Sequence, residues 1–223
     1  MKLKRKLFCF LLSFALFFNS SAQAVEEGDE VITPYYGPSF FKGVFGNPYS
    51  SSIISSSQNY KVDDIGTFGI YSEYLLNDIV GVGIDIYYNK SVSSWNETND
   101  VYNPTTMQYE PKTYDYKVTA PTFAALGRFN FHYSSFYSLF SDDFDTYVIL
   151  AFGYKKTNYK VQTNDPNYNF DPNKNTFSLF NASNPIGGKL GAGFRFFITD
   201  EAGITLELYA GRPYVSGGVS FRF

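Results

Sequence analysis

Cysteine, histidine and long apolar runs are scarce in this chain of 223 residues, which contains one cysteine and one histidine. A lone cysteine cannot build an intramolecular disulfide framework, and a lone histidine leaves little material for catalysis by a nucleophile and a histidine base. Beyond the N-terminus, no apolar run approaches the roughly 20 residues that a transmembrane helix needs. The sequence therefore excludes a disulfide-rich scaffold and a bundle of membrane-spanning helices.

Clusters of basic residues are also missing after the first six positions. The formal net charge is -3 and the pI is about 5.2. A nucleic-acid-binding chain needs a concentrated positive patch. The sequence predicts no nucleic-acid partner.

Aromatic residues, by contrast, are abundant, with 20 Tyr and 24 Phe making up most of a 20% aromatic content. This content suits the aromatic girdles of a membrane β-barrel, and a soluble aromatic-rich β-sandwich is the alternative. The mean hydropathy of -0.21 is compatible with a barrel, because a barrel strand presents only every second side chain to lipid.

Residues 1–24 have the features of a secretory signal peptide. Basic residues from Lys2 to Lys6 precede an apolar core over 7–18, which holds Cys9, and Ala22-Gln23-Ala24 fits the small-x-small cleavage pattern. Residues 25–36 begin with an acidic stretch and are predicted to be a periplasmic lead-in. The barrel domain is predicted to span 37–223.

Alternation of polarity is clearest near the C-terminus. In 202–211, Ala, Ile and Leu occupy one face and Gly, Thr, Glu and Tyr the other, and 214–223 repeats the pattern. Similar segments bring the expected number of antiparallel strands to eight: 39–46, 65–75, 80–88, 119–131, 147–155, 189–198, 202–211 and 214–223. The first of these has Phe on both faces, so its register is open.

Connections alternate in length, which favours an up-and-down barrel. Tight turns are expected at 77–78 and 199–201, and long polar loops at about 47–62, 93–113 and 162–184. Short turns would face the periplasm and long loops the outside. The aromatic connection 132–143, which holds the only histidine, is expected at the periplasmic interface.

Charges of both signs fall on the predicted inward faces. Unpaired buried ions are costly, so we expect an interior ion-pair network that plugs the barrel. Its predicted members are Glu73, Asp85, Arg128, Lys189, Arg195, Glu207 and Arg222. Opposed strands would place Arg195 diagonally across from Glu207, and that pair is a specific prediction.

These features together resemble the small OmpA/OmpX-type outer-membrane barrel family. The matching segments are the cleavage site, the strand 121–131 with inward Arg128, Gly191-Ala192-Gly193-Phe194-Arg195-Phe196, and the closing Val219-Ser220-Phe221-Arg222-Phe223. The resemblance implies a bacterial, Gram-negative outer-membrane location and contact with outer-membrane lipid. It also implies that Phe221 and Phe223 act as a signal to the barrel assembly machinery, although they can equally be ordinary lipid-facing aromatics.

Catalytic, cofactor and metal sites are not predicted. His132 falls at an expected turn, and Asp142, Asp143 and Asp145 beside it lack calcium-loop spacing and are read as solvated. Exposed aromatics on the long loops are instead possible binding anchors. They are Trp95, Tyr102, Tyr109 and Tyr168.

The leading functional hypothesis is a monomeric barrel with a plugged interior and a structural or surface-interaction role through its outer loops, whose ligand the sequence does not name. The alternative is a narrow, porin-like channel for small solutes or hydrophobic ligands, suggested by the small interior residues Gly81, Gly83, Gly191 and Gly193. An enzyme acting on outer-leaflet lipids ranks last, because no histidine lies near the outer rim.

Overall fold

The computed structural model describes residues 25–38, 58–133, 143–168, 185–210 and 213–223. The described chain is built from antiparallel strands, and among these residues no helix is long and apolar enough to cross a membrane. The strands are β1 (Glu30–Gly37), β2 (Gln58–Leu75), β3 (Val80–Asn103), β4 (Gln108–His132), β5 (Phe144–Thr157), β6 (Lys160–Thr163), β7 (Ile186–Phe197), β8 (Ala202–Tyr209) and β9 (Val215–Arg222).

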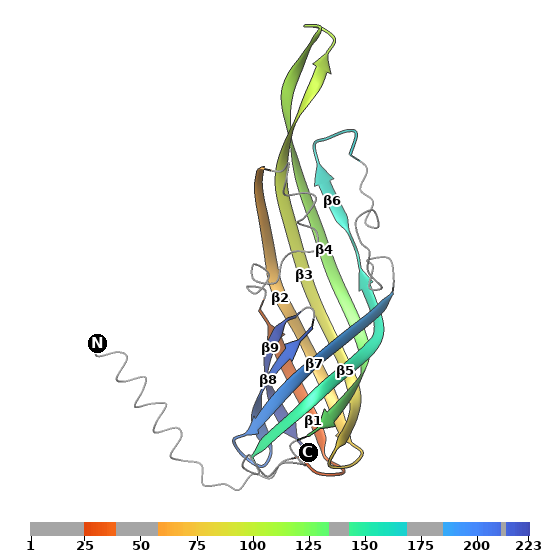
Figure 1. Cartoon of the computed structure of the whole chain (residues 1–223), viewed down its shortest axis with the longest axis vertical. Helices are drawn as coiled ribbons and strands as arrows, with labels where there is room; N and C mark the ends of the chain where they lie inside the picture. The colour runs from red at the N-terminus through yellow and green to blue at the C-terminus, as the bar shows by residue number, and fades with distance from the viewer. Residues whose placement is uncertain (1–24, 39–57, 134–142, 169–184, 211–212) are drawn as a thin grey trace, which may run out of the picture.

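Eight of these strands form a closed ring. They follow the order β3-β2-β1-β9-β8-β7-β5-β4, and pairing of β3 with β4 joins the two ends (Figure 1). β6 lies outside the ring and continues the line of β5 along β4, where Lys160 pairs with Thr119. The predicted all-β, eight-stranded, up-and-down barrel is confirmed.

Side chains alternate between the inside and the outside of the ring. Along β1, Val31, Thr33 and Tyr35 are buried, whereas Tyr36 is 42% exposed. The outward positions of the other ring strands are mostly large and apolar: Phe68, Ile70, Tyr74, Ile84, Ile86, Tyr88, Phe123, Phe129, Phe131, Val148, Leu150, Phe152, Tyr154, Leu190, Phe194, Ile204, Leu208, Val219 and Phe221. The barrel is therefore apolar outside and more polar inside.

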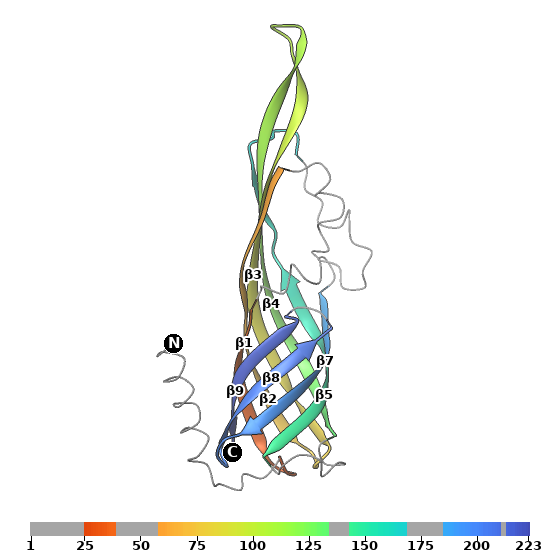
Figure 2. The ribbon, with the colours of Figure 1, turned by 60° about the vertical axis from the view of Figure 1, so that its left-hand side comes forward.

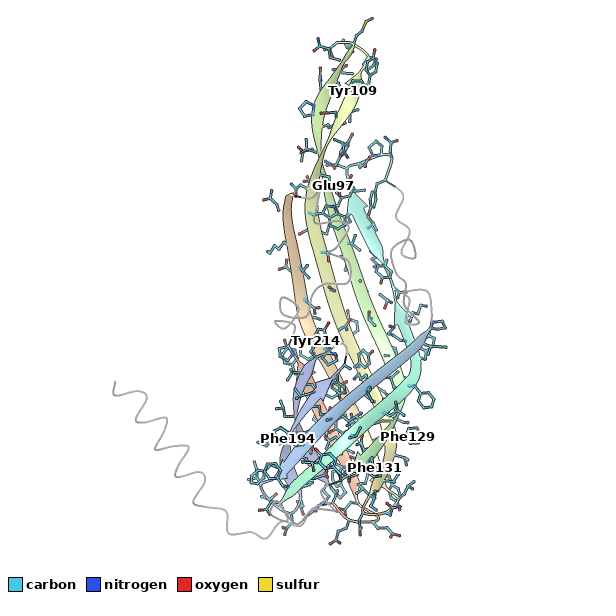
Figure 3. All side chains as sticks on the ribbon, viewed as in Figure 1. Glu97, Tyr109, Phe129, Phe131, Phe194 and Tyr214 are labelled. Carbon is cyan, nitrogen blue, oxygen red and sulfur yellow. The ribbon has the colours of Figure 1, made fainter. Side chains whose placement is uncertain are left out.

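Aromatic side chains gather toward both ends of this outer surface. Phe129, Phe131 and Phe194 lie near the end with the tight turns (Figure 3). Nearer the opposite end, exposed aromatics on four neighbouring strands are direct cross-strand partners in one row: Tyr36, Phe68, Tyr88 and Phe123. On β2 the order is Phe68, Ile70 and Tyr74, so an aliphatic residue separates two aromatic ones. An aliphatic band between two aromatic girdles is typical of a membrane-spanning barrel.

The first strand begins earlier than the sequence predicts. Glu30–Gly37 pairs with both β2 and β9, so most of the expected lead-in 25–36 belongs to the barrel. The acidic residues 26–30 show no alternation, and the proline at 34 cannot donate to a ladder, so the sequence pattern does not indicate a strand here. The ladder to β9 has no pairing at Thr33 and Pro34, and Thr33 instead bonds Ser220 through side-chain hydroxyls 2.7 Å apart. The strand expected at 39–46 and the signal peptide 1–24 lie outside the described residues.

The expected loop 93–113 is a second difference. It is a hairpin of two long strands, in which all 24 residues of β3 pair with β4 and only residues 104–107 connect them. Two views show this hairpin extending well beyond the ring along the long axis (Figures 1 and 2). Both of its faces lie outside the barrel, so the inside-outside alternation that identifies the other strands is lost.

Candidate functional site

The interior of the barrel is filled by three linked layers of charged and tyrosine side chains. Nearest the tight turns, Arg195 donates to Glu73 at 2.9 Å and to Asp145 at 3.1 Å. Both ring nitrogens of His132 face carboxylates, Nδ1 at 2.7 Å from Asp145 and Nε2 at 2.8 Å from Glu73. A protonated ring donates to both, so His132 acts as a second cation in this layer.

The middle layer is the pair of Arg128 and Glu207. Their Nη2 and Oε1 atoms are 2.5 Å apart, and both side chains are 1% exposed. Tyr147 donates to Glu207 at 2.8 Å, and the Arg128 guanidinium lies 3.7 Å from the centroid of the Tyr71 ring. The carboxylate is therefore satisfied by a cation and a hydroxyl, and the cation also by an aromatic face.

Asn130 connects these two layers. Its side-chain oxygen accepts from Arg128 Nε at 3.0 Å, and its amide nitrogen donates to Glu73 at 2.6 Å. Because the buried Asn130 amide bonds to one member of each layer, a shift of one ion pair would displace the other.

The third layer lies further toward the long loops. Lys189 Nζ is 2.7 Å from Asp85 and 2.9 Å from the hydroxyl of Tyr35. Tyr35 in turn donates to Asp85 at 2.8 Å. Four carboxylates in the three layers, Glu73, Asp85, Asp145 and Glu207, face Arg128, Lys189 and Arg195, and a protonated His132 balances the charge.

Six of the seven predicted interior residues therefore lie in this network, and the specific pair of Arg195 with Glu207 is wrong. Arg195 is the direct cross-strand partner of Asp145 on β5, whereas Glu207 bonds Arg128. Asp145 also belongs to the network, although the sequence pattern places it in a solvated turn, because β5 begins at Phe144. His132 was misplaced for the same reason: it is the last residue of β4 and fully buried.

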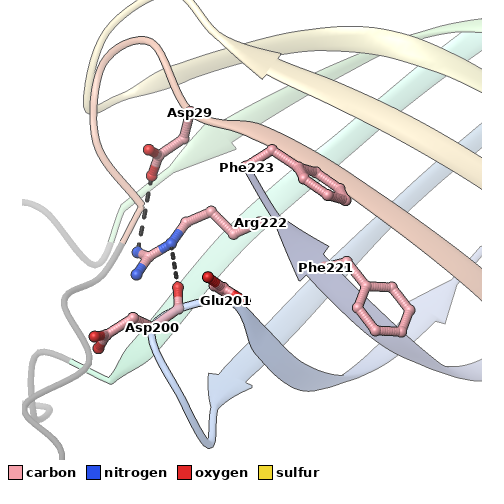
Figure 4. Close-up of a pocket in the computed structure, with 6 residues that line it drawn as sticks. All are labelled: Asp29, Asp200, Glu201, Phe221, Arg222 and Phe223. Carbon is pink, nitrogen blue, oxygen red and sulfur yellow. Dashed lines mark hydrogen bonds and ion pairs between the residues drawn. The ribbon is translucent and has the colours of Figure 1, made fainter.

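Arg222, the seventh predicted residue, lies apart from the network. It donates to the backbone oxygen of Asp200 at 2.7 Å and lies 3.8 Å from Asp29 (Figure 4). These residues line a depression of about 470 Å³ at the turn end of the barrel. Arg222 therefore ties the last strand to the neighbouring turn and to the segment before β1.

The interior glycines make room for the network. A Cβ at Gly193 would lie 2.5 Å from the Tyr147 ring, and one at Gly191 would lie 2.7 Å from the Tyr209 ring. At Gly81 the Glu73 carboxylate occupies the corresponding space. The small interior glycines that suggested a channel thus have another explanation, because neighbouring side chains occupy the space beside Gly81, Gly191 and Gly193.

Phe221 and Phe223, the predicted assembly signal, both point away from the interior. They are 42% and 75% exposed, respectively. Phe223 also exchanges backbone hydrogen bonds with Glu30, at 2.9 and 3.2 Å. The end of the chain thus meets the start of the first strand.

The loop aromatics divide into two groups. Trp95 and Tyr116 stack at 5.3 Å between ring centroids, and with Tyr114, Val118 and Tyr168 they form a small core on the extended hairpin. Burial and the hydrogen bond to Asp165 raise the pKa of Tyr116, so its hydroxyl remains a donor at neutral pH. Trp95 and Tyr168 therefore have structural roles, Trp95 within the hairpin and Tyr168 packed against it.

Tyr102 and Tyr109, by contrast, are exposed. They are direct cross-strand partners with ring centroids 5.5 Å apart, and they are 50% and 72% exposed. Figure 3 shows Tyr109 near the far end of the hairpin, beyond Glu97. This pair is a fixed aromatic surface held far from the barrel.

In the described ranges, the buried histidine and acidic side chains are grouped in ion pairs. No group of at least three histidine, cysteine or acidic side chains there could hold a metal ion. His132 lacks a nucleophile among its hydrogen-bond partners, which are the two carboxylates.

Comparison with known proteins finds similar chains among solved structures. No family model matches the chain, and neither does any curated protein. Among solved structures it is similar to OprG from Pseudomonas aeruginosa, at 13% identity over 90% of this chain and 98% of that one, with a TM-score of 0.38. Ail of Yersinia pestis, solved with the heparin analogue sucrose octasulfate, matches at 12% identity over 88% and 99%, with a TM-score of 0.33.

The N-terminal β-barrel domain of Pseudomonas aeruginosa OprF matches at 11% identity over 89% of this chain and 100% of that domain, with a TM-score of 0.31. The fold itself is decided by the closed ring of strands. This chain is a small eight-stranded β-barrel. The fold expected from the resemblance to the OmpA/OmpX-type family is thus present, and the barrel differs from a minimal one in its long β3-β4 hairpin.

Proposed function

We propose that the protein is a non-enzymatic, monomeric barrel of the bacterial outer membrane, which holds a rigid hairpin outside the cell for contact with a surface ligand. The observation that carries this proposal is the unbroken β3-β4 ladder, which ends beside the exposed pair Tyr102 and Tyr109. A continuous ladder supported by the Trp95 core keeps this aromatic pair in a fixed position.

The outer surface supports a membrane location. Leu150, Leu190 and Phe152 point outward from the ring and are 53%, 55% and 58% exposed. Such a surface in water would be an unusually large apolar patch, whereas in lipid it is the favourable arrangement. The closed ring also pairs its backbone groups internally, as a bilayer requires.

The interior supports a structural role for the barrel itself. Its three ion-paired layers fill the cross-section with side chains that bond one another rather than a solute. Recognition is therefore assigned to the hairpin, where rigid exposed tyrosines supply contact area at low entropic cost. Phe221 and Phe223 are proposed to contact lipid and the barrel assembly machinery.

Orientation can be tested by labelling intact cells. The predicted mature chain has no cysteine, so Tyr109→Cys and Asp200→Cys would each introduce one thiol. A membrane-impermeant maleimide should label Tyr109→Cys on intact cells and Asp200→Cys only after permeabilisation. The reverse pattern would overturn the proposed orientation.

Recognition is tested with the double variant Tyr102→Ser/Tyr109→Ser. A panel of immobilised glycans and extracellular proteins is first screened for members that bind cells with the parent protein. Cells with the double variant should bind those members at least about tenfold more weakly, because hot-spot aromatics dominate such contacts. Thr98→Ala/Thr113→Ala, a cross-strand pair nearer the barrel, is the matched control. Equal binding by parent and tip variant would exclude the tip as the contact.

A further inference from the structure

The ammonium group of Lys189 lies in an enclosure of aromatic rings inside the barrel. Its Nζ is 4.1 Å from the ring centroid of Tyr87 and 5.1 Å from those of Tyr35 and Tyr209. The Asp85 carboxylate at 2.7 Å completes the surroundings. The side chain of Lys189 is only 2% exposed, so the enclosure shields the ammonium from water.

The wall of this enclosure comes from three strands, and a fourth supplies the enclosed lysine. β1 supplies Tyr35, β3 supplies Asp85 and Tyr87, β8 supplies Tyr209, and β7 supplies the lysine. Tyr35 packs directly over Gly69, and Tyr209 packs over Gly191, where any Cβ would collide with the ring. Two glycines are thus required to seat two of the three rings.

An aromatic enclosure with one carboxylate is the arrangement by which proteins recognise ammonium ions. The ring faces attract the cation within about 6 Å, and the attraction increases when water is excluded. A simple buried ion pair would need only Asp85 and hydrogen-bonding groups. Here Tyr35 contacts Nζ chiefly through its hydroxyl, at 2.9 Å. The rings of Tyr87 and Tyr209 add a preference for a compact organic cation over an inorganic one.

We propose that Tyr35, Tyr87, Tyr209 and Asp85 form an ammonium-binding site whose ligand class is primary alkylammonium ions, and that Lys189 is its tethered occupant. Tethering gives the lysine a very high effective concentration, so a free amine competes poorly with it. The site becomes available to a free ligand when the lysine side chain is removed. This inference concerns the barrel interior and does not depend on the hairpin's role.

The test is chemical rescue of Lys189→Ala. This substitution leaves Asp85 buried without its cation, and propylammonium supplies the missing atoms. Saturating propylammonium chloride should raise the melting temperature of the refolded variant in detergent micelles by about 3 °C, because a ligand that binds only the folded state stabilises it. Propanol and sodium chloride should not do so, and methylammonium should do so less.

Three controls make the result specific. The parent protein should not respond, because Lys189 already occupies the site. Lys189→Met, which fills the space without a charge, should not respond either. Adding Tyr87→Leu to Lys189→Ala should weaken propylammonium binding about tenfold, in line with the loss of one cation–aromatic contact.

If Lys189→Ala does not fold alone, refolding yield becomes the measurement. Propylammonium, and not propanol, should then restore the yield toward that of the parent. Equal effects of propanol and propylammonium, an equal response of Lys189→Met, or no response in either melting temperature or yield would each overturn the proposal.

Discussion

Arg128 and Glu207 form an ion pair although their strands, β4 and β8, are separated in the ring by β5 and β7. The bond therefore crosses the interior rather than joining neighbours in the sheet. Because both side chains are buried, the attraction between the two charges is the main term that offsets the cost of removing each of them from water. The pair ties together opposite parts of the barrel wall.

Breaking this pair should be costly. We expect Arg128→Met or Glu207→Gln to lower the free energy of unfolding by about 3–5 kcal/mol, since each leaves a buried partner uncompensated. The double variant should lose less than the sum of the two single losses. Urea-induced unfolding in lipid vesicles provides the measurement. Additive losses would mean that the two residues do not act on each other.

Gly193 and Gly127 provide a matched pair of substitutions. A Cβ at Gly193 meets the Tyr147 ring at 2.5 Å, whereas one at Gly127 has its nearest neighbour at 3.7 Å, a backbone oxygen. Gly193→Ala should displace Tyr147 from Glu207 and destabilise the barrel by about 1–3 kcal/mol, as overpacking does. Gly127→Ala should be nearly neutral. Urea-induced unfolding in lipid vesicles compares the two variants. Equal stability of the two variants would show that the Tyr147 ring can move at little cost.

Leu190→Arg tests the lipid-facing surface. Leu190 is 55% exposed near the middle of the outward band, so the charge should cost about 2–4 kcal/mol in a bilayer. Val101→Arg on the hairpin is the control, because Val101 is exposed beyond the ring and should tolerate the change. Vesicle refolding followed by urea titration compares them. A Leu190→Arg variant as stable as the parent would contradict a lipid contact at this position.

The sequence predicted those parts of the fold where two different environments meet across a strand. Residues 202–211 alternate because one face meets lipid and the other the polar interior. The hairpin beyond Trp95 escaped prediction because neither face meets lipid, and its pairing depends on cross-strand contacts such as Trp95 with Tyr116. The first strand escaped prediction because its acidic start shows no alternation and Pro34 cannot donate to a neighbour. The ladder to β9 accommodates the proline by having no pairing at Thr33 and Pro34.

The interior charges were predictable as a set but not as pairs. Inward position follows from the period of two, so Glu73, Arg195 and Glu207 could be assigned to the interior. Partner choice depends on the length of each side chain and on the curvature of the ring, which the sequence does not reveal. His132 belongs to the network because β4 continues to that residue, which the sequence pattern does not indicate.

The gap in the β1–β9 ladder at Thr33 and Pro34 also affects how the barrel forms and opens. The other adjacent strands of the ring are close in sequence, but β1 meets β9 across 187 residues between Thr33 and Ser220. Closing so large a loop carries the greatest entropic cost of any pairing in the ring, and contacts of this kind form slowly. The join between the first and last strands is thus expected to form late. Because two consecutive pairs are missing from its ladder, it is also where the barrel should open first when it is pulled apart.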